Sequence, residues 1–175
     1  MLPYQRIHVT GNAGSGKTTL ARELAKELDL PFVSLDSVVW RPGWKPAPSV
    51  ELREDLNKIA AEPRWVIDGV SKTIRDAADI VIYLEVSRRR CAWRCARRNL
   101  PYLFRSRPEL PAGCPEWAST GLLARIIWKF PNTVGVRLVE QSQSDQRYRV
   151  VRNTDDLERV KRELTAGDSG GSSTS

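Results

Sequence analysis

The sequence is poor in cysteine and histidine, with three cysteines and one histidine among 175 residues. Three cysteines cannot all pair, so the chain does not indicate a disulfide scaffold. Cys91 and Cys95 lie one helical turn apart, but with Cys114 and His8 they do not provide enough ligands for a metal site. We therefore expect buried or idle thiols.

Long hydrophobic runs are also missing. No run approaches the roughly 18 to 20 apolar residues that cross a bilayer. A glycine-rich motif that begins at Gly11 leaves no room for a signal peptide, and we expect a cytoplasmic protein without a membrane partner. The hydrophobic fraction of 41% is ordinary for a soluble globule. The length of 175 residues predicts one domain, over residues 1–165. Residues 166–175, rich in serine and glycine, are expected to form a flexible tail.

Acidic residues are absent from one segment of a chain whose net charge is +7. From Arg88 to Arg107 there are eight arginines and no aspartate or glutamate, so the positive field is concentrated there. This placement favours a patch that handles phosphate groups. Nucleic-acid binding is the alternative, although the segment has few interleaved aromatic residues and the chain has no RNA-binding signature or helix-turn-helix pattern that we identify.

The stretch from Val9 to Leu20, V-T-G-N-A-G-S-G-K-T-T-L, contains the pattern G-x-x-x-x-G-K-[ST] of a phosphate-binding loop. Its glycines allow backbone conformations in which successive N–H groups point at an anion. Lys17 would place a cation against the β- and γ-phosphates of ATP, and Thr18 would offer its hydroxyl to Mg²⁺. The residues predicted to bind the nucleotide are Gly11, Ala13, Gly14, Ser15, Gly16, Lys17, Thr18 and Thr19.

The motif has the sequence context that a phosphate loop requires. An apolar run at residues 7–9 precedes it, and apolar residues at helical spacing follow it from Leu20 to Leu28. The order is therefore strand, glycine loop and helix. A Rossmann dinucleotide site is disfavoured, because its G-x-G-x-x-G fingerprint carries no Lys-Thr pair.

Apolar runs and helical periodicity predict an α/β domain with a central first strand. The expected strands cover 4–9, 32–35, 64–67, 79–85 and 147–152, and the expected helices cover 16–28, 49–61, 87–99, 121–143 and 153–164, the fourth interrupted or kinked near Pro131. Residues 37–48 are too rich in proline for a regular element, residues 71–78 are predicted to be a short connector, and residues 101–120 a mobile flap.

Two aspartates follow predicted strands, at the sheet edge where α/β proteins bind ligands. Asp36 is well placed to meet an acceptor, where it would orient a hydroxyl or accept its proton. If the acceptor is a nucleoside monophosphate, a structural role is favoured. Asp68 ends an apolar strand and is predicted to hold Mg²⁺ through water; the alternative is a turn-forming Asp-Gly pair.

Two further groups have more than one interpretation. Trp40 and Trp44 could stack on a ring of the acceptor or plug their loop onto the protein body. Arg94 and Arg98 lie four residues apart on one helical face, which suits capture of a transferring phosphate. Solvated surface is the alternative for any arginine of this helix.

Five motifs spread over nearly the whole chain except the tail carry a family resemblance. They are G-x-x-G-S-G-K-T at 11–18, L-D-S-V-V-W-R-P-G-W at 35–44, R-W-V-I-D-G at 64–69, W-R-C-A-R-R at 93–98 and R-S-R-P-E-L-P-A-G-C-P-E at 105–116. Through them the chain resembles the adenylate-kinase-like branch of phosphate-loop kinases, most closely the topology-modulation (FlaR-related) family. It departs from that family after Gly69, where the connector is shorter.

The resemblance implies a three-layer fold with a five-stranded parallel sheet flanked by helices. It also implies an acceptor-binding region over about 36–62 and an arginine-rich lid over about 99–120. Arg94 and Arg98 match phosphate-binding arginines at the lid entrance, and adenine would lie between that entrance and the turn near Asn153.

We therefore expect an ATP-dependent kinase that uses Mg²⁺ and transfers the γ-phosphate to a nucleoside, nucleotide or other small-molecule acceptor. A nucleotide-dependent regulator that binds nucleic acid, or an ATPase coupled to a partner, are the alternatives. The protein is expected to be a monomer or a homodimer. The expected catalytic residues are Lys17, Arg94, Arg98 and Asp36, and the expected metal-binding residues are Thr18 and Asp68.

Overall fold

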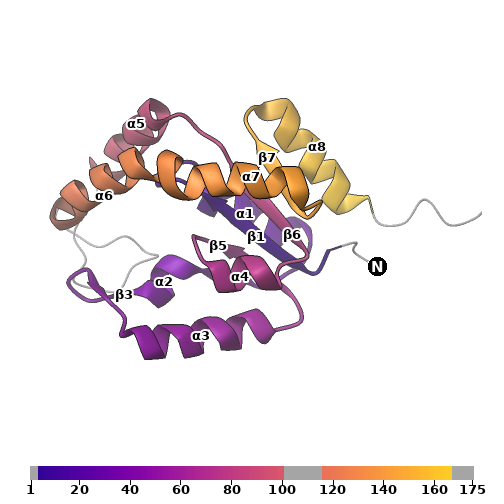
Figure 1. The fold of residues 1–175 in the computed structure, drawn as a ribbon, viewed down its shortest axis with the longest axis horizontal. Coiled ribbons are helices and arrows are strands. Elements are labelled where there is room, and N and C mark those ends of the chain that lie inside the picture. The colour runs from indigo at the N-terminus through magenta and orange to yellow at the C-terminus, as the bar shows by residue number, and fades with distance from the viewer. Residues whose placement is uncertain (1–3, 101–115, 167–175) are drawn as a thin grey trace, which may run out of the picture.

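The computed structural model describes residues 4–100 and 116–166. Figure 1 shows the arrangement of its helices and strands. The helices are α1 (Lys17–Glu27), α2 (Leu35–Val39), α3 (Ser49–Ala61), α4 (Lys72–Ala77), α5 (Arg88–Asn99), α6 (Glu116–Phe130), α7 (Val136–Ser144) and α8 (Thr154–Thr165). The strands are β1 (Arg6–Gly11), β2 (Phe32–Ser34), β3 (Trp40–Arg41), β4 (Lys45–Pro46), β5 (Trp65–Asp68), β6 (Ile80–Leu84) and β7 (Tyr148–Val151).

Five of the strands form one parallel sheet in the order β2-β5-β1-β6-β7. β1 is the central strand, so the phosphate loop that follows it lies at the middle of the carboxyl edge of the sheet. The register places Val9 of β1 opposite Asp68 of β5, and Ser34 of β2 opposite the same aspartate. The predicted parallel sheet flanked by helices is confirmed.

Helices cover both faces of the sheet, which explains why its central strands are continuous apolar runs. On one face, Ile7 and Val9 pack with the apolar sides of α1 and α8. On the other face, Ile67 and Tyr83 pack with α3, α4 and α7. Among the described residues, no helix is both long and apolar enough to cross a membrane.

The segment 37–48, predicted to be irregular, is partly regular. It contains the end of α2 and an antiparallel pair of two-residue strands, β3 and β4, joined by Pro42, Gly43 and Trp44. Proline argues against a central strand because it lacks an N–H group, but it is tolerated at the edge of a short pair. The prediction was wrong because it took the proline content to exclude any regular element, whereas this small separate hairpin tolerates proline.

Two further segments differ from the expected elements. The connector at 71–78 contains α4, which Ser71 caps by accepting a hydrogen bond from the N–H of Ile74 at 3.4 Å. Residues 116–120, predicted to belong to the flap, begin α6; the rest of the predicted flap, 101–115, lies outside the described residues. At Pro131, which has no N–H to donate, the chain forms a π-helix over Pro131–Gly135 and continues into α7.

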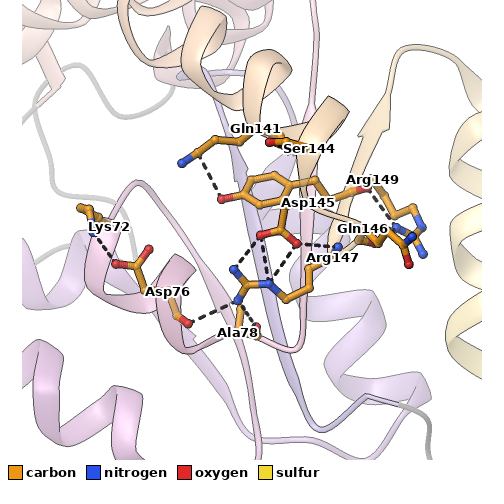
Figure 2. Close-up of polar contacts among 10 residues, drawn as sticks. Lys72, Asp76, Ala78, Gln141, Ser144, Asp145, Gln146, Arg147 and Arg149 are labelled. Carbon is orange, nitrogen blue, oxygen red and sulfur yellow. Dashed lines mark hydrogen bonds and ion pairs between the residues drawn. The ribbon is translucent and has the colours of Figure 1, made fainter.

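A polar cluster joins the start of β7 to the end of α4 (Figure 2). Arg147 binds the carboxylate of Asp145, with Nη2 at 2.7 Å from Oδ2, and it donates through Nη1 to the carbonyl of Ala78 at 3.0 Å. The hydroxyl of Tyr148 donates to Gln141 of α7 at 3.1 Å. These contacts connect α4, α7 and β7 at the β7 edge of the sheet. All three elements lie far from the phosphate loop in the sequence.

Candidate nucleotide and acceptor site

The phosphate loop, residues 11–18, connects the central strand to α1. Gly14 has φ of 76°, and a Cβ atom there would lie 2.5 Å from the carbonyl oxygen of Cys91 and 2.8 Å from Sγ of Cys95. Both cysteines are buried on α5, so the loop and α5 approach each other as closely as glycine permits. The prediction of buried thiols is confirmed for these two cysteines; Cys114 lies outside the described residues.

Side chains from distant elements hold the loop in place. Asn12 donates through Nδ2 to the carbonyl of Ile127 on α6 at 2.9 Å, and its Oδ1 accepts the N–H of Ala13 at 2.8 Å. Arg94 of α5 donates through Nη1 to the carbonyl of Ser15 at 3.1 Å. α5 and α6 lie side by side at one end of the molecule (Figure 1). The loop is therefore fixed from both helices.

Thr18 and Asp68 meet at the carboxyl edge of the sheet. The Thr18 hydroxyl donates to Oδ2 of Asp68, and, within the described residues, the buried Oδ1 accepts no hydrogen bond. Burial raises the pKa of the Asp68 carboxyl above its usual value, although the Thr18 hydrogen bond and, to a lesser degree, the Ser34 side chain oppose the shift. A hydroxyl oxygen and an unsatisfied carboxylate oxygen are hard donors of the kind that Mg²⁺ prefers, so this pair fits Mg²⁺ held together with water and phosphate.

His8 was missed as a site residue. Its side chain is buried in β1, with Nε2 at 3.1 Å from the carbonyl oxygen of Gly69. Burial lowers the pKa of His8 to about 4, against the opposing effect of the Gly69 hydrogen bond. The neutral ring therefore donates to the carbonyl of Gly69, the residue that follows Asp68. The sequence carries no signal for this contact, because the register between β1 and β5 creates it.

Two cavities open on the two sides of the phosphate loop. The larger has a volume of about 810 Å³ and is lined by Ser15, Gly16, Thr19, Leu20, Glu23, Leu84, Glu85, Val86, Ser87, Arg90, Arg94, Val151, Arg152, Asn153, Thr154 and Leu157. The smaller has a volume of about 290 Å³ and is lined by Gly11, Ala13, Gly14, Lys17, Thr18, Leu35, Asp36, Val39, Trp40, Trp44, Gly69, Val70, Leu123, Ile126 and Phe130.

The predicted site residues divide between these cavities. Lys17 and Asp36 line the smaller cavity, with Asp36 in the first turn of α2. Arg94 and Asn153 line the larger one, and Oδ1 of Asn153 also caps α8 by accepting the N–H of Asp156 at 2.8 Å. The side chain of Arg98 lies outside the described part of the structure.

The smaller cavity also has walls that sequence reasoning did not identify. Ile126 and Phe130 reach it from α6, a helix that follows the phosphate loop by about a hundred residues in the sequence. Trp40 and Trp44, which the sequence assigned either to stacking on the acceptor or to plugging their loop, also line the cavity. They contact each other edge to face, with ring centroids 5.4 Å apart and an angle of 72° between the rings.

Comparison with known sequences places kinases among the relatives of this chain. Residues 7–83, less than half of the chain, match the ATPase family associated with various cellular activities (AAA). The cytidylate kinase of Pyrobaculum calidifontis is 32% identical over 110 residues, 53% of this chain and 60% of that enzyme. A shikimate kinase of Bacteroides fragilis is 58% identical over 31 residues, 18% of this chain and 17% of that enzyme. The chain thus spans less than two thirds of the length of each relative.

Comparison with solved structures gives the fold. A shikimate kinase from Acinetobacter baumannii in complex with shikimate superposes with a TM-score of 0.55 at 18% identity, over 94% of each chain. A gluconokinase from Sinorhizobium meliloti superposes with a TM-score of 0.53 at 18% identity, over 92% of this chain and 90% of that one. The protein therefore has the phosphate-loop kinase fold.

Proposed function

We propose that this protein is a kinase that transfers the γ-phosphate of ATP to a small-molecule acceptor. The observation that carries the proposal is the presence of a cavity on each side of one phosphate loop. An enzyme that only hydrolyses ATP needs space for water beside the γ-phosphate. The smaller cavity instead offers about 290 Å³ enclosed largely by apolar side chains, which suits a molecule larger than water.

The larger cavity takes ATP, with its phosphates along the loop. The loop N–H groups and Lys17 neutralise the β- and γ-phosphates. Arg94, whose guanidinium lies beside Ser15, contacts the transferring phosphate, and Arg98 follows one helical turn later. In this proposal adenine lies between the lid entrance and the turn near Asn153. The Thr18 hydroxyl, and Asp68 through water, would hold Mg²⁺, which when bound would neutralise charge on the phosphate oxygens.

The acceptor occupies the smaller cavity and reacts in line. Its oxygen bonds to the γ-phosphorus, the bond to the β–γ bridging oxygen breaks, and ADP leaves. When the acceptor is an alcohol, the Asp36 carboxylate accepts the hydroxyl proton. In this proposal the acceptor-binding region covers about residues 36–62, and the lid covers about residues 99–120. The five sequence motifs also support membership of the topology-modulation family.

The test is ADP formation from Mg·ATP with a panel of nucleosides, nucleoside monophosphates and small phosphorylatable alcohols. Lys17→Ala serves as the blank, since it removes the phosphate-neutralising cation from the half-buried first position of α1 and is expected to retain the fold. Turnover that rises with an acceptor supports a kinase. If wild-type turnover is the same with and without each acceptor, the proposal is contradicted and an ATPase coupled to a partner is favoured. Equal turnover by Lys17→Ala and the wild type also contradicts the proposal.

A further inference from the structure

The smaller cavity has a composition that selects among acceptors, and the following inference rests on the proposed kinase function. Its walls are mainly apolar and aromatic, with Trp40, Trp44 and Phe130 among them. Its volume of about 290 Å³ lies at the lower end of the range for small-molecule sites, about 300–1,000 Å³. The charged groups among its described lining residues are Lys17 and Asp36.

The charge distribution opposes an anionic acceptor. Lys17 belongs to the loop that receives the ATP phosphates, which leaves the Asp36 carboxylate as the charge facing the acceptor. Arg41, next to Trp40 in the chain, pairs with Glu51 at 3.6 Å and with Asp55 at 4.0 Å. A phosphate or carboxylate on the acceptor would therefore meet a like charge.

Trp44 occupies a backbone position that is unfavourable for it. It has φ of 58° and follows Gly43, with φ of 78°, in the three-residue connection between β3 and β4. Glycine is the usual residue at the left-handed position of such a turn. A bulky residue in this conformation is strained, and strain of this kind clusters at ligand clamps. The turn thus holds an indole ring against Trp40 at the cavity wall at the expense of backbone strain.

We propose that the acceptor is an uncharged molecule of the nucleoside class, whose planar ring packs against Trp40 and Trp44 and whose hydroxyl is presented to Asp36. In the reaction the hydroxyl oxygen bonds to the γ-phosphorus and ADP is the leaving group. The hydroxyl proton passes to the Asp36 carboxylate and from there to solvent. The aromatic pair accounts for ring binding, and the carboxylate accounts for both proton removal and rejection of phosphorylated analogues.

The first experiment compares matched acceptors. Initial rates of ADP formation are measured with cytidine and cytidine 5′-monophosphate, with guanosine and guanosine 5′-monophosphate, and with glycerol as a ringless alcohol. The expected kcat/KM for a nucleoside exceeds that for its monophosphate and that for glycerol by about tenfold or more. Equal or higher values for the monophosphates or for glycerol would overturn this inference while leaving the kinase function intact. If none of these acceptors, nor any of the wider panel, stimulates turnover, the kinase function itself fails.

Two variants separate ring binding from a structural role of the tryptophan. Trp44→Gly is expected to raise the KM for the nucleoside by about 5- to 100-fold, the loss of one stacked ring, and to leave the KM for ATP unchanged. Trp93→Leu, at an exposed position on α5, is the matched control and keeps both constants. An unchanged nucleoside KM in Trp44→Gly, or an equal rise in both KM values with a lower Tm, assigns Trp44 to plugging its loop and overturns the inference.

The third variant tests the carboxylate. Asp36→Asn is expected to lower kcat with nucleosides by about 10²- to 10⁴-fold, because the base is lost. The same variant is expected to bind the monophosphates more tightly than the wild type in a tryptophan-fluorescence titration, because the like charge is removed. An unchanged kcat, or weaker monophosphate binding, would overturn the assignment of Asp36.

Discussion

Thr18 of the phosphate loop donates its hydroxyl hydrogen to Asp68 at the end of the neighbouring strand. The two residues are 50 positions apart in the sequence, and the parallel register of β1 and β5 brings them together. The second carboxylate oxygen of Asp68 is buried without a hydrogen-bond donor among the described residues. A metal ion with its water shell would satisfy this oxygen.

We predict that Asp68→Asn weakens the response to Mg²⁺. The amide retains the size of the carboxylate but loses its charge, and outer ligands of this kind contribute about 10- to 100-fold to metal affinity. The measurement is ATP turnover as a function of free Mg²⁺ at saturating ATP. Asp76→Asn, on the exposed side of α4, is the control. Half-saturation at the same Mg²⁺ concentration as the wild type would remove Asp68 from the metal site.

A pair of glycines tests the contact between the phosphate loop and α5. Gly14 and Gly43 have nearly the same φ, 76° and 78°, but a Cβ at Gly43 meets no atom within 4 Å. Gly43→Ala should therefore lower the free energy of unfolding by about 1–2 kcal/mol from backbone strain alone.

Gly14→Ala should cost about 1–3 kcal/mol more than Gly43→Ala, because its Cβ would clash with the Cys91 carbonyl. It should also abolish ATP binding measured by calorimetry, since the loop must move. The two free energies come from urea denaturation. If both variants lose the same free energy of unfolding and Gly14→Ala retains its ATP affinity, α5 must shift to accommodate the added methyl group.

His8 gives the protein a specific pH dependence. Its pKa falls from 6.5 to about 4 on folding, so the unfolded chain binds the proton first as the pH decreases. The stability that the neutral ring contributes is complete above pH 6.5 and is lost as the pH falls through about 4. The difference corresponds to about 3 kcal/mol in the free energy of unfolding.

Because the chain has one histidine, its ring resonance can be followed by NMR without assignment. The midpoint should lie near pH 4 in the folded protein. His8→Gln keeps an N–H donor for Gly69 and should flatten the stability profile between pH 4 and 6.5 relative to the wild type. A histidine midpoint near 6.5, or parallel profiles for the two proteins, would show that the ring is accessible to solvent.

Arg94 is expected to act on the transferring phosphate. Its guanidinium donates to a carbonyl of the phosphate loop. Arg94→Ala should lower kcat by about 10²- to 10³-fold, and Arg94→Lys should recover little, because a single ammonium does not reproduce the planar fork. Arg89→Ala, on the exposed surface of the same helix, should behave as the wild type. Similar losses in both alanine variants would assign the effect to the net charge of α5.

Arg147 is predicted to stabilise the sheet edge without affecting catalysis. Arg147→Ala removes the hydrogen bonds to Asp145 and to the carbonyl of Ala78 and should lower the free energy of unfolding by about 1–3 kcal/mol. Lys72→Ala breaks the exposed pair with Asp76 in the same region (Figure 2) and should cost about 0.5 kcal/mol or less. Urea denaturation measures both, and kcat should be unchanged in each. A cost for Lys72→Ala equal to that for Arg147→Ala would contradict this ranking.

Local signals in the sequence predicted much of the fold. The apolar runs located the strands of the parallel sheet, and the phosphate-loop motif located the turn between β1 and α1. Predictions failed where the pattern depends on neighbours in space. The hairpin of β3 and β4 and the helix α4 are too short for a clear period, whereas the interruption predicted near Pro131 is present as the π-helix at Pro131–Gly135.

The sequence by itself determined which backbone segment cradles phosphate, because glycine positions and the adjoining lysine and threonine act through neighbouring backbone atoms. Only the tertiary structure decided what surrounds that segment. Asn12 reaches Ile127 across 115 positions, Arg94 reaches Ser15 across 79, and His8 reaches Gly69 across 61. Strand register and helix packing set these contacts, and both depend on the burial of side chains from the whole chain. The smaller cavity, which residues of both α2 and α6 line, has the same origin.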